Sequence, residues 1–239
     1  MSMSTVTAVD HRSRVAAERR ERTRKRLLES AMIVYAQKGM TSSVIQDVVA
    51  EADVSQGSFY NYFKTNEALF VALATEFSNE IVRMIEPVIN EIDHPALKIA
   101  TAIRSYLHMM RSCPVATQFI AKAGLRLMSR ANSLEVFLPR DLKAGQQQGL
   151  FTPIPVRLAI QMISGTGLMV IGGMVTGETP EDAPEQVTDM ILRALGVPPG
   201  DAGRFVEYPL VHIMIPEDSL LARAQARFQT GCTLATNVV

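Results

Sequence analysis

Uncharged hydrogen-bonding side chains fill the segment from Asp53 to Leu69 (DVSQGSFYNYFKTNEAL). No charged residue stands between Asp53 and Lys64, and two tyrosines flank Asn61. Serine, glutamine, asparagine and tyrosine side chains donate and accept hydrogen bonds, and they form no nucleophile–base pair here. Gly57 falls where a helix should begin and leaves a gap among these side chains. The segment predicts a short polar and aromatic helix whose use depends on its surroundings.

Catalytic and metal-binding patterns are not found in the rest of the sequence. The four histidines have no metal-ligand spacing with one another or with the cysteines, and Cys113 and Cys232 form no CxxC pair. The segment 164–173 (SGTGLMVIGG) is not a dinucleotide-binding GxGxxG, because Val170 occupies the last position and no strand precedes it. We therefore expect no enzymatic activity, no cofactor and no metal.

Basic side chains are concentrated near the N-terminus. The chain has 24 Lys and Arg against 24 Asp and Glu, so its overall charge indicates no partner. Residues 11–26 (HRSRVAAERRERTRKR) nevertheless hold eight Arg or Lys against two Glu. Such a run is typical of a solvated helix face or of a segment that neutralises nucleic-acid phosphates. We expect residues 1–19 to form a disordered basic N-terminal arm.

Helical periodicity covers most of the 239 residues, of which 47% are apolar. A first helix ends at Gly39, a second helix of about two turns ends near Ala52, and Ser55 can cap a third. From residue 67 to residue 195 the pattern continues as longer helices separated by proline and glycine. No convincing alternating strand is present, so the predicted fold class is all-α.

The C-terminal extension, residues 200–239, differs from the helical pattern before it. Its segment Tyr208–Ile215 (YPLVHIMI) is an apolar run of strand length. Residues 216–231 then begin with a proline, carry acids in the first turn and end at a glycine, as a short amphipathic helix does. Its apolar side chains share one face, so this helix must dock against another part of the chain.

The gapless run of residues 24–69 strongly resembles the TetR family of bacterial transcription regulators. The residues that carry the resemblance are Ala31, Tyr35, Gly39, Val48, Ala52, Val54, Ser55, Gly57, Phe59, Tyr60, Phe63, Lys64, Glu67, Ala68 and Leu69. The resemblance implies a three-helix DNA-binding domain at residues 20–80, with its helix-turn-helix at about 44–63. A larger helical domain for ligand binding and dimerisation would follow at residues 81–199.

The resemblance makes Ser55–Tyr62 the recognition helix, which lies in the major groove of DNA. Gln56 and Asn61 can then read adenine, while Gly57 allows the helix backbone to approach the DNA closely. Phe59 and Phe63 are expected to face the small core. The predicted DNA contacts are Ser42, Ser43, Ser55, Gln56, Gly57, Ser58, Tyr60, Asn61, Tyr62, Lys64 and Asn66, with Arg19, Arg20 and Arg22 in the arm.

Two positions depart from the family pattern. Asp53 stands where the family most often has glycine, in a turn that needs a residue tolerant of positive φ. Asn66 stands where the family often has a lysine that contacts phosphate. An asparagine there can still hydrogen-bond a phosphate or cap the fourth helix, but one Coulombic contact is lost.

A ligand pocket among the fourth to eighth helices is implied by the resemblance. Methionine is an adaptable pocket lining, and Arg104 and His108 lie one helical turn apart. Ordinary core or surface roles are the alternative for each candidate. The candidate ligand residues are Met84, Arg104, His108, Met109, Gln118, Arg126, Met162 and Met169.

A dimer interface is implied for residues 156–176 and 187–196, because the last two core helices of TetR-like proteins build one. Gly165 and Gly172 are seven residues apart on one helical stripe and would permit a second helix to approach closely. The candidate interface residues are Gly165, Leu168, Gly172 and Ile191.

These observations predict a homodimeric, ligand-responsive repressor that binds a pseudo-palindromic operator in double-stranded DNA and is released by a small apolar or amphipathic effector. The alternative is a DNA-binding protein of the same fold that is controlled by a protein partner or acts without a ligand. Glycines interrupt the apolar segment 158–175, which favours a buried helix over a membrane span. That segment, the distant cysteines and the polar N-terminus predict a cytoplasmic protein that does not contact membranes.

Overall fold

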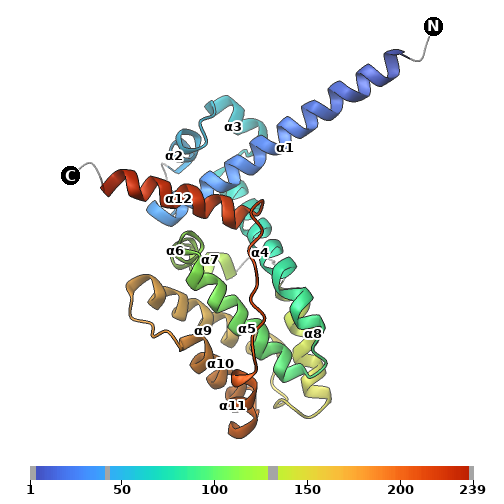
Figure 1. Ribbon diagram of the computed structural model, residues 1–239, viewed down its shortest axis with the longest axis vertical. Coiled ribbons are helices and arrows are strands. Elements are labelled where there is room, and N and C mark those ends of the chain that lie inside the picture. The colour runs from blue at the N-terminus through green and yellow to red at the C-terminus, as the bar shows by residue number, and fades with distance from the viewer. Residues whose placement is uncertain (1–3, 41–43, 129–133, 237–239) are drawn as a thin grey trace.

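The computed structural model describes residues 4–40, 44–128 and 134–236. Within these ranges it contains twelve helices and no strand, which confirms the all-α prediction (Figure 1). The helices are α1 (Ser4–Lys38), α2 (Val44–Glu51), α3 (Gln56–Tyr62), α4 (Asn66–Asn90), α5 (Pro95–Ser112), α6 (Pro114–Ala123), α7 (Leu125–Met128), α8 (Leu134–Gln147), α9 (Val156–Thr176), α10 (Ala183–Ala194), α11 (Pro199–Glu207) and α12 (Leu220–Thr236).

The basic N-terminal segment is helical rather than disordered. Helix α1 begins at Ser4, and its N-terminal half projects away from the body of the molecule (Figure 1). No proline or glycine interrupts α1, and Arg14 pairs with Glu18 one turn later at 3.6 Å. The prediction of a disordered arm missed this continuity, because a dense charge run that includes acids can still form a helix.

Helices α2 and α3 are joined by a tight turn at Asp53, which has a φ of 49°. This left-handed conformation is uncommon for residues other than glycine, and aspartate is one of the few that tolerate it. The Ser55 hydroxyl accepts a hydrogen bond from the Ser58 amide at 3.1 Å, so Ser55 is the N-cap of α3, as predicted. Phe59 and Phe63 are buried and anchor this short helix to the core, also as predicted.

Helix α4 connects the two halves of the molecule. It starts at the N-cap Thr65, continues past Pro87 and runs without interruption through residue 80, the predicted domain boundary. One apolar cluster includes residues of α1 to α6 and of α12, and it contains the mutually packed rings of Tyr35, Phe70 and Phe119. A second cluster lies among α5 and α8 to α11. Helices α1 to α3 therefore share a core with the half of the molecule that follows them.

Helix α9 is long and apolar enough to cross a membrane by length and composition alone. Only 17% of its most apolar window is buried, which differs from the buried helix that we predicted. Its buried side chains are Ala159, Ile163 and Ile171, and it packs against α6 and α8. One such helix is weak evidence for a membrane span, and the described chain leaves the other side of α9 uncovered.

The C-terminal extension returns to the start of the chain. After α11 it runs as irregular backbone from Tyr208 to Pro216, so the apolar run of strand length pairs with no sheet. Helix α12 then lies across α1, next to α4 and α6 (Figure 1). The predicted amphipathic helix therefore docks with its apolar side in the first apolar cluster.

Candidate nucleic-acid interface

One side of α3 carries polar side chains that the fold leaves exposed. Gln56, Tyr60 and Asn61 are exposed, while Ser58 and Tyr62 are half-buried. The Tyr60 ring packs edge-on against the buried ring of Phe59, with centroids 5.4 Å apart. Amide and hydroxyl groups thus stand on a helix whose opposite side is fixed in the core.

Gly57 is not required by the fold. Its φ is not positive, and a Cβ added there would meet only the Ser55 hydroxyl, at 4.0 Å. The chain itself therefore supplies no packing or backbone reason for glycine at this position.

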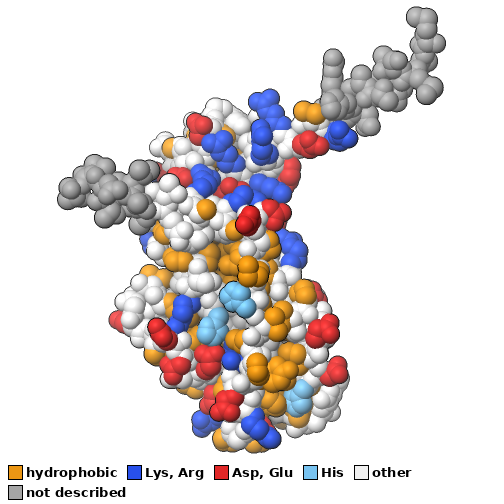
Figure 2. All heavy atoms as spheres, in the orientation of Figure 1, with side chains coloured by type: hydrophobic (Ala, Val, Ile, Leu, Met, Phe, Trp, Pro, Cys, Tyr) orange, Lys and Arg blue, Asp and Glu red, His pale blue; other side chains and the backbone are white. Residues whose placement is uncertain are grey.

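Basic residues border the exposed face of α3. The Arg20 guanidinium lies 6.0 Å from the centre of the Tyr62 ring, which brings α1 alongside α3. Arg19 and Arg22 are exposed on the same stretch of α1. Lys64 donates a hydrogen bond to the Tyr60 carbonyl at 2.7 Å, so its ammonium is held at the C-terminal end of α3. Figure 2 shows Lys and Arg side chains gathered over the α1–α3 end of the molecule.

Asn66 has a partner inside the protein. The buried Tyr35 hydroxyl donates to Asn66 Oδ1 at 2.6 Å, and burial raises the pKa of Tyr35 well above its usual value. The residue that caps α4 is Thr65, whose hydroxyl accepts from the Ala68 amide at 3.0 Å, so Asn66 is not the cap. A lysine at position 66 would offer Tyr35 no side-chain acceptor and would leave only the backbone carbonyl of residue 66, 3.5 Å away, which gives the departure from the family pattern a physical reason. Ser42 and Ser43 lie outside the described residues.

The predicted polar ligand pair, Arg104 and His108, contacts the protein itself. Glu185 Oε1 lies 3.2 Å from Arg104 Nε and 2.8 Å from His108 Nε2, and Arg104 also donates to the Tyr208 carbonyl at 2.7 Å. Burial alone would raise the pKa of Glu185, but the hydrogen bond and charge of His108, with the hydrogen bond from Arg104, lower it. This cluster ties α10 and the C-terminal extension to α5.

The other predicted ligand residues do not converge on one cavity. Met109 is buried in the first apolar cluster, and Met162 packs against the second. Gln118 borders a hollow of about 290 Å³ between α6 and α9. Arg126 pairs with Glu67 at 2.9 Å. Met169 is 75% exposed on α9 and is not among the residues that line this hollow.

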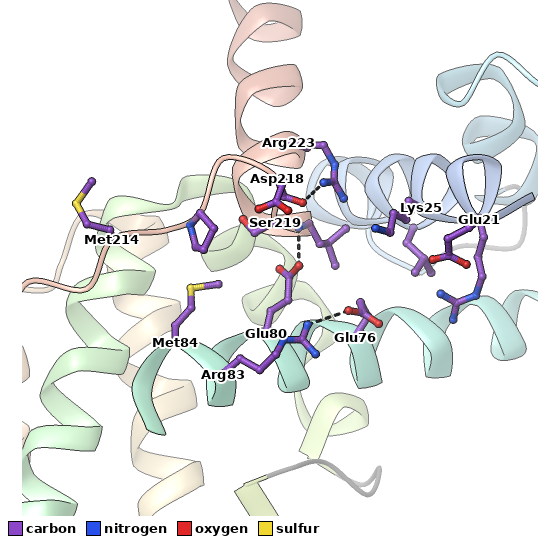
Figure 3. A pocket seen from close by; sticks show the side chains of 14 residues that line it. Glu21, Lys25, Glu76, Glu80, Arg83, Met84, Met214, Asp218, Ser219 and Arg223 are labelled. Atoms are coloured by element: carbon purple, nitrogen blue, oxygen red, sulfur yellow. Dashed lines mark hydrogen bonds and ion pairs between the residues drawn. The ribbon is translucent and has the colours of Figure 1, made fainter. Parts of the chain in front are cut away.

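A larger hollow, of about 480 Å³, lies between α1, α4 and the C-terminal extension (Figure 3). Met84 and Met214 stand at one end, and Lys25 lies toward the other end with Arg24 one position before it on α1. Glu80 projects into the space between these ends, and its carboxylate is bound by the extension (Figure 3). We name this space the junction hollow. The sequence offered no signal for it, because its walls come from segments far apart in the chain.

The uncovered side of α9 is mainly apolar, with one exposed polar residue, Gln161. Besides Met169, Leu158 is 57% exposed, and a Cβ added at Gly165 or Gly172 would meet nothing within 4 Å. Leu168 packs in part against the first apolar cluster.

One predicted interface residue is corrected by the structure. Ile191 is only 3% exposed because it packs into the second cluster, whereas its neighbour Met190 is 62% exposed. A one-residue step turns an α-helix by about 100°, so the surface of α10 is presented by Met190.

Comparison with known proteins places the DNA-proximal helices in a family. The family described as "Bacterial regulatory proteins, tetR family" matches residues 27–73. The HTH-type transcriptional repressor DhaR of Mycobacterium sp. (strain GP1) is 32% identical over 75 residues, which make up 31% of this chain and 38% of DhaR. The fatty acid metabolism regulator protein of Bacillus subtilis (strain 168) is 26% identical over 153 residues, covering 59% of this chain and 77% of that protein.

Solved structures extend the likeness beyond the helix-turn-helix. The crystal structure of RolR in complex with resorcinol matches with a TM-score of 0.67 and 26% identity, over 83% of this chain and 100% of RolR. FadR from Bacillus subtilis in complex with stearoyl-CoA shares the fold, with a TM-score of 0.58 and 23% identity over 71% of this chain and 96% of that one. From the matched helix-turn-helix, the repressor relatives and the shared all-helical architecture, we conclude that the chain belongs to the non-enzymatic TetR family of helix-turn-helix transcriptional regulators.

Proposed function

We propose that the protein is a homodimeric repressor that binds a pseudo-palindromic operator through α3 and leaves it when a small amphipathic molecule binds. Residues 20–80 would form the DNA-binding unit, and residues 81–199 the ligand-binding and dimerisation unit, of a cytoplasmic protein. The observation that carries this proposal is the exposed polar side of α3, which presents Tyr60 and Asn61 beside a glycine that the fold does not need.

The DNA-binding part follows from the chemistry of this side of α3. Asparagine and glutamine amides can pair with both N6 and N7 of adenine, and tyrosine hydroxyls can donate to phosphates. The missing Cβ at Gly57 would let the backbone come nearer to the groove. Arg19, Arg20 and Arg22 would contribute the sequence-independent charge that α3 lacks.

The homodimer is supported by the uncovered apolar side of α9. Monomeric proteins seldom expose a large contiguous apolar patch unless it serves binding, and here two glycines would allow a second helix to approach. A two-fold dimer would present two copies of α3, which suits successive half-sites about one turn of DNA apart.

The junction hollow is the candidate effector site. Its volume of about 480 Å³ falls within the usual range for small-molecule sites. Methionines stand at one end, and the other end has Arg24 and Lys25 together with Glu21, so the lining suits a molecule with an apolar body and a polar group. Within the described residues, Arg24 and Lys25 have no ion-pair partner.

Release would follow from the position of that hollow. Its walls belong to α1 of the DNA-binding unit, to α4 and to the C-terminal extension. A ligand that binds better when these elements are further apart would favour a dimer whose recognition helices no longer match the operator.

Operator selection tests the DNA-binding part. Duplexes that bind the wild type would be selected from random sequences, and their affinity for variants measured by fluorescence anisotropy. We expect Asn61→Ala to weaken binding to the selected operator by about tenfold or more, since it removes a base contact. The matched control is Asn90→Ala, an equally exposed asparagine at the far end of α4. Equal affinities of the two variants would contradict the assignment of α3.

Addition of resorcinol or stearoyl-CoA, the ligands bound in the two structural relatives, tests the effector part. We expect release by the amphipathic stearoyl-CoA, and a loss of that response in Met84→Trp, which fills the hollow. The control Leu125→Trp adds the same ring at an exposed position of α7. Retention of the operator with both ligands would argue for control by a protein partner.

A further inference from the structure

We propose that helix α12 positions the helix-turn-helix for DNA binding, and that Arg227 is the residue through which it acts. In a dimer this contact would set the separation of the two recognition helices. The inference therefore rests on the proposed homodimeric function.

The apolar side of α12 is embedded in the core that the DNA-proximal helices share. Leu220, Leu221, Ala224 and Phe228 are buried, and α12 packs against α1, α4 and α6. The helix is therefore an integral part of the structure beside the helix-turn-helix, although it comes last in the chain.

One end of α12 is fixed to the middle of α4, the helix that connects the two halves. The Glu80 carboxylate of α4 accepts hydrogen bonds from the amides of Leu220 and Leu221 at 2.6 and 3.2 Å (Figure 3). Two of the free amides at the start of α12 are thereby satisfied by an acid, the charge that a helix start favours. Gln225 Oε1 accepts from the Val115 amide of α6 at 3.0 Å, which provides a second attachment.

The other attachments lead to the helix-turn-helix. Arg223 Nε lies 2.6 Å from Glu29 Oε1 of α1, a carboxylate that is almost fully buried. Arg227 Nη2 lies 2.7 Å from both the carboxylate Oε1 and the backbone carbonyl of Glu51, and Arg227 Nη1 lies 3.7 Å from Glu29 Oε2. Glu51 is the last residue of α2, directly before the turn that leads to α3.

A guanidinium that binds both a side chain and the final carbonyl of a helix fixes the orientation of that helix as well as its distance from the guanidinium. Arg227 therefore holds α2 at the point from which the recognition helix is aimed. Because the start of α12 is bound to Glu80, a movement of α4 would carry α12 with it and be transmitted to α2 through Arg227.

The test uses the operator selected with the wild-type protein and two derivatives, with one base pair inserted or removed between the half-sites. We expect the wild type to lose affinity for both derivatives, because half-site spacing follows the geometry of the dimer. In Arg227→Gln the ratio of affinities between operator and derivatives should fall by about tenfold. Non-specific DNA affinity, dimer mass and helical circular dichroism should stay as in the wild type.

Matched variants separate positioning from general destabilisation. Glu51→Gln removes the acidic partner of the same ion pair. It should lower the ratio of affinities between the operator and its spacing derivatives as Arg227→Gln does, and the double variant should show no further loss. It also serves if Arg227→Gln fails to fold. Arg204→Gln breaks an exposed ion pair with Asp201 in α11 and should leave discrimination unchanged.

The outcomes distinguish this inference from the proposed function. A wild type that binds all three spacings equally would contradict the homodimer on a two-part operator. A wild type that discriminates, together with Arg227→Gln and Glu51→Gln variants that discriminate equally well, would overturn the role of α12.

Discussion

Helices α3 and α9 each have a side that residues 4–40, 44–128 and 134–236 leave uncovered, and the chemistry of the two sides is opposite. The side of α3 carries amides and hydroxyls, whereas that of α9 carries methionine and leucine. Both contain glycine that no contact among the described residues requires, at positions 57, 165 and 172. A missing Cβ thus permits a partner to approach the backbone of either helix closely. The neighbouring side chains decide whether that partner is a polar DNA groove or another apolar helix.

The largest expected effect comes from closing the gap on α3. Gly57→Leu should fold, because a Cβ at 57 meets only Ser55 at 4.0 Å, but it should weaken operator binding by about a hundredfold. The expected cause is a steric clash with the DNA, and fluorescence anisotropy would measure it.

Gly200→Leu supplies the control for that variant, since Gly200 of α11 also has no neighbour within 4 Å. If Gly57→Leu bound the operator as tightly as the control, the uncovered side of α3 would not be the side that faces DNA, and its distinction from the side of α9 would be lost.

The next largest effect concerns the apolar side. Met169→Glu places a charge on α9 and should raise the dimer dissociation constant by about tenfold, because burying a charge without a partner is costly. Sedimentation equilibrium would measure this constant.

Met214→Glu is the matched control, because Met214 and Met169 are each 75% exposed but Met214 lies in the C-terminal extension. If the two substitutions had the same effect on dimerisation, α9 would lose its assignment as the interface.

A smaller effect is expected beneath the polar side. Asn66→Ala removes the closer acceptor of the buried Tyr35 hydroxyl, leaves only the backbone carbonyl at 3.5 Å, and should lower the free energy of unfolding by about 1 kcal/mol. Urea denaturation would measure the loss. Adding Tyr35→Phe should restore much of it, since the unsatisfied hydroxyl is then absent, and a double variant no more stable than Asn66→Ala would refute this account.

The smallest effect belongs to Glu185, which forms part of neither side. Its pKa lies below the ordinary 4.5, so its ion pairs stabilise the folded state above that pH. This stabilisation is lost as the pH falls through the lowered pKa, and it should amount to less than about 0.5 kcal/mol because the pair is partly exposed. In acid denaturation, the free energy of unfolding of Glu185→Gln should therefore fall slightly less with decreasing pH than that of the wild type. Identical curves would exclude the contribution.

Local features were predictable because adjacent residues determine them. The Ser55 cap forms between residues three apart, and the positive φ at Asp53 belongs to a turn whose length the sequence displays. The same holds for Phe59 and Phe63, because their spacing puts both rings on one side of a helix.

Other features depend on partners that the sequence does not bring together. Tyr35 and Asn66 are 31 residues apart, and Glu51 and Arg227 are 176 apart, so no pattern indicates these contacts. Met169 was assigned to a pocket because methionine is an adaptable pocket lining, but apolar residues and glycine occupy nearly every side of α9. A helix of that composition gives no sign of which side faces its own core.

The position of α12 has a consequence for biosynthesis. A ribosome that has completed the first 219 residues has made all of α1 to α4 but none of the arginines that neutralise the buried Glu29 carboxylate. The apolar surface of α1, α4 and α6 against which α12 packs is then still open to solvent. The DNA-binding unit therefore reaches its final form only after the end of the chain has been synthesised. A polypeptide that is terminated before α12 lacks the complete DNA-binding unit even though it contains every residue of α3.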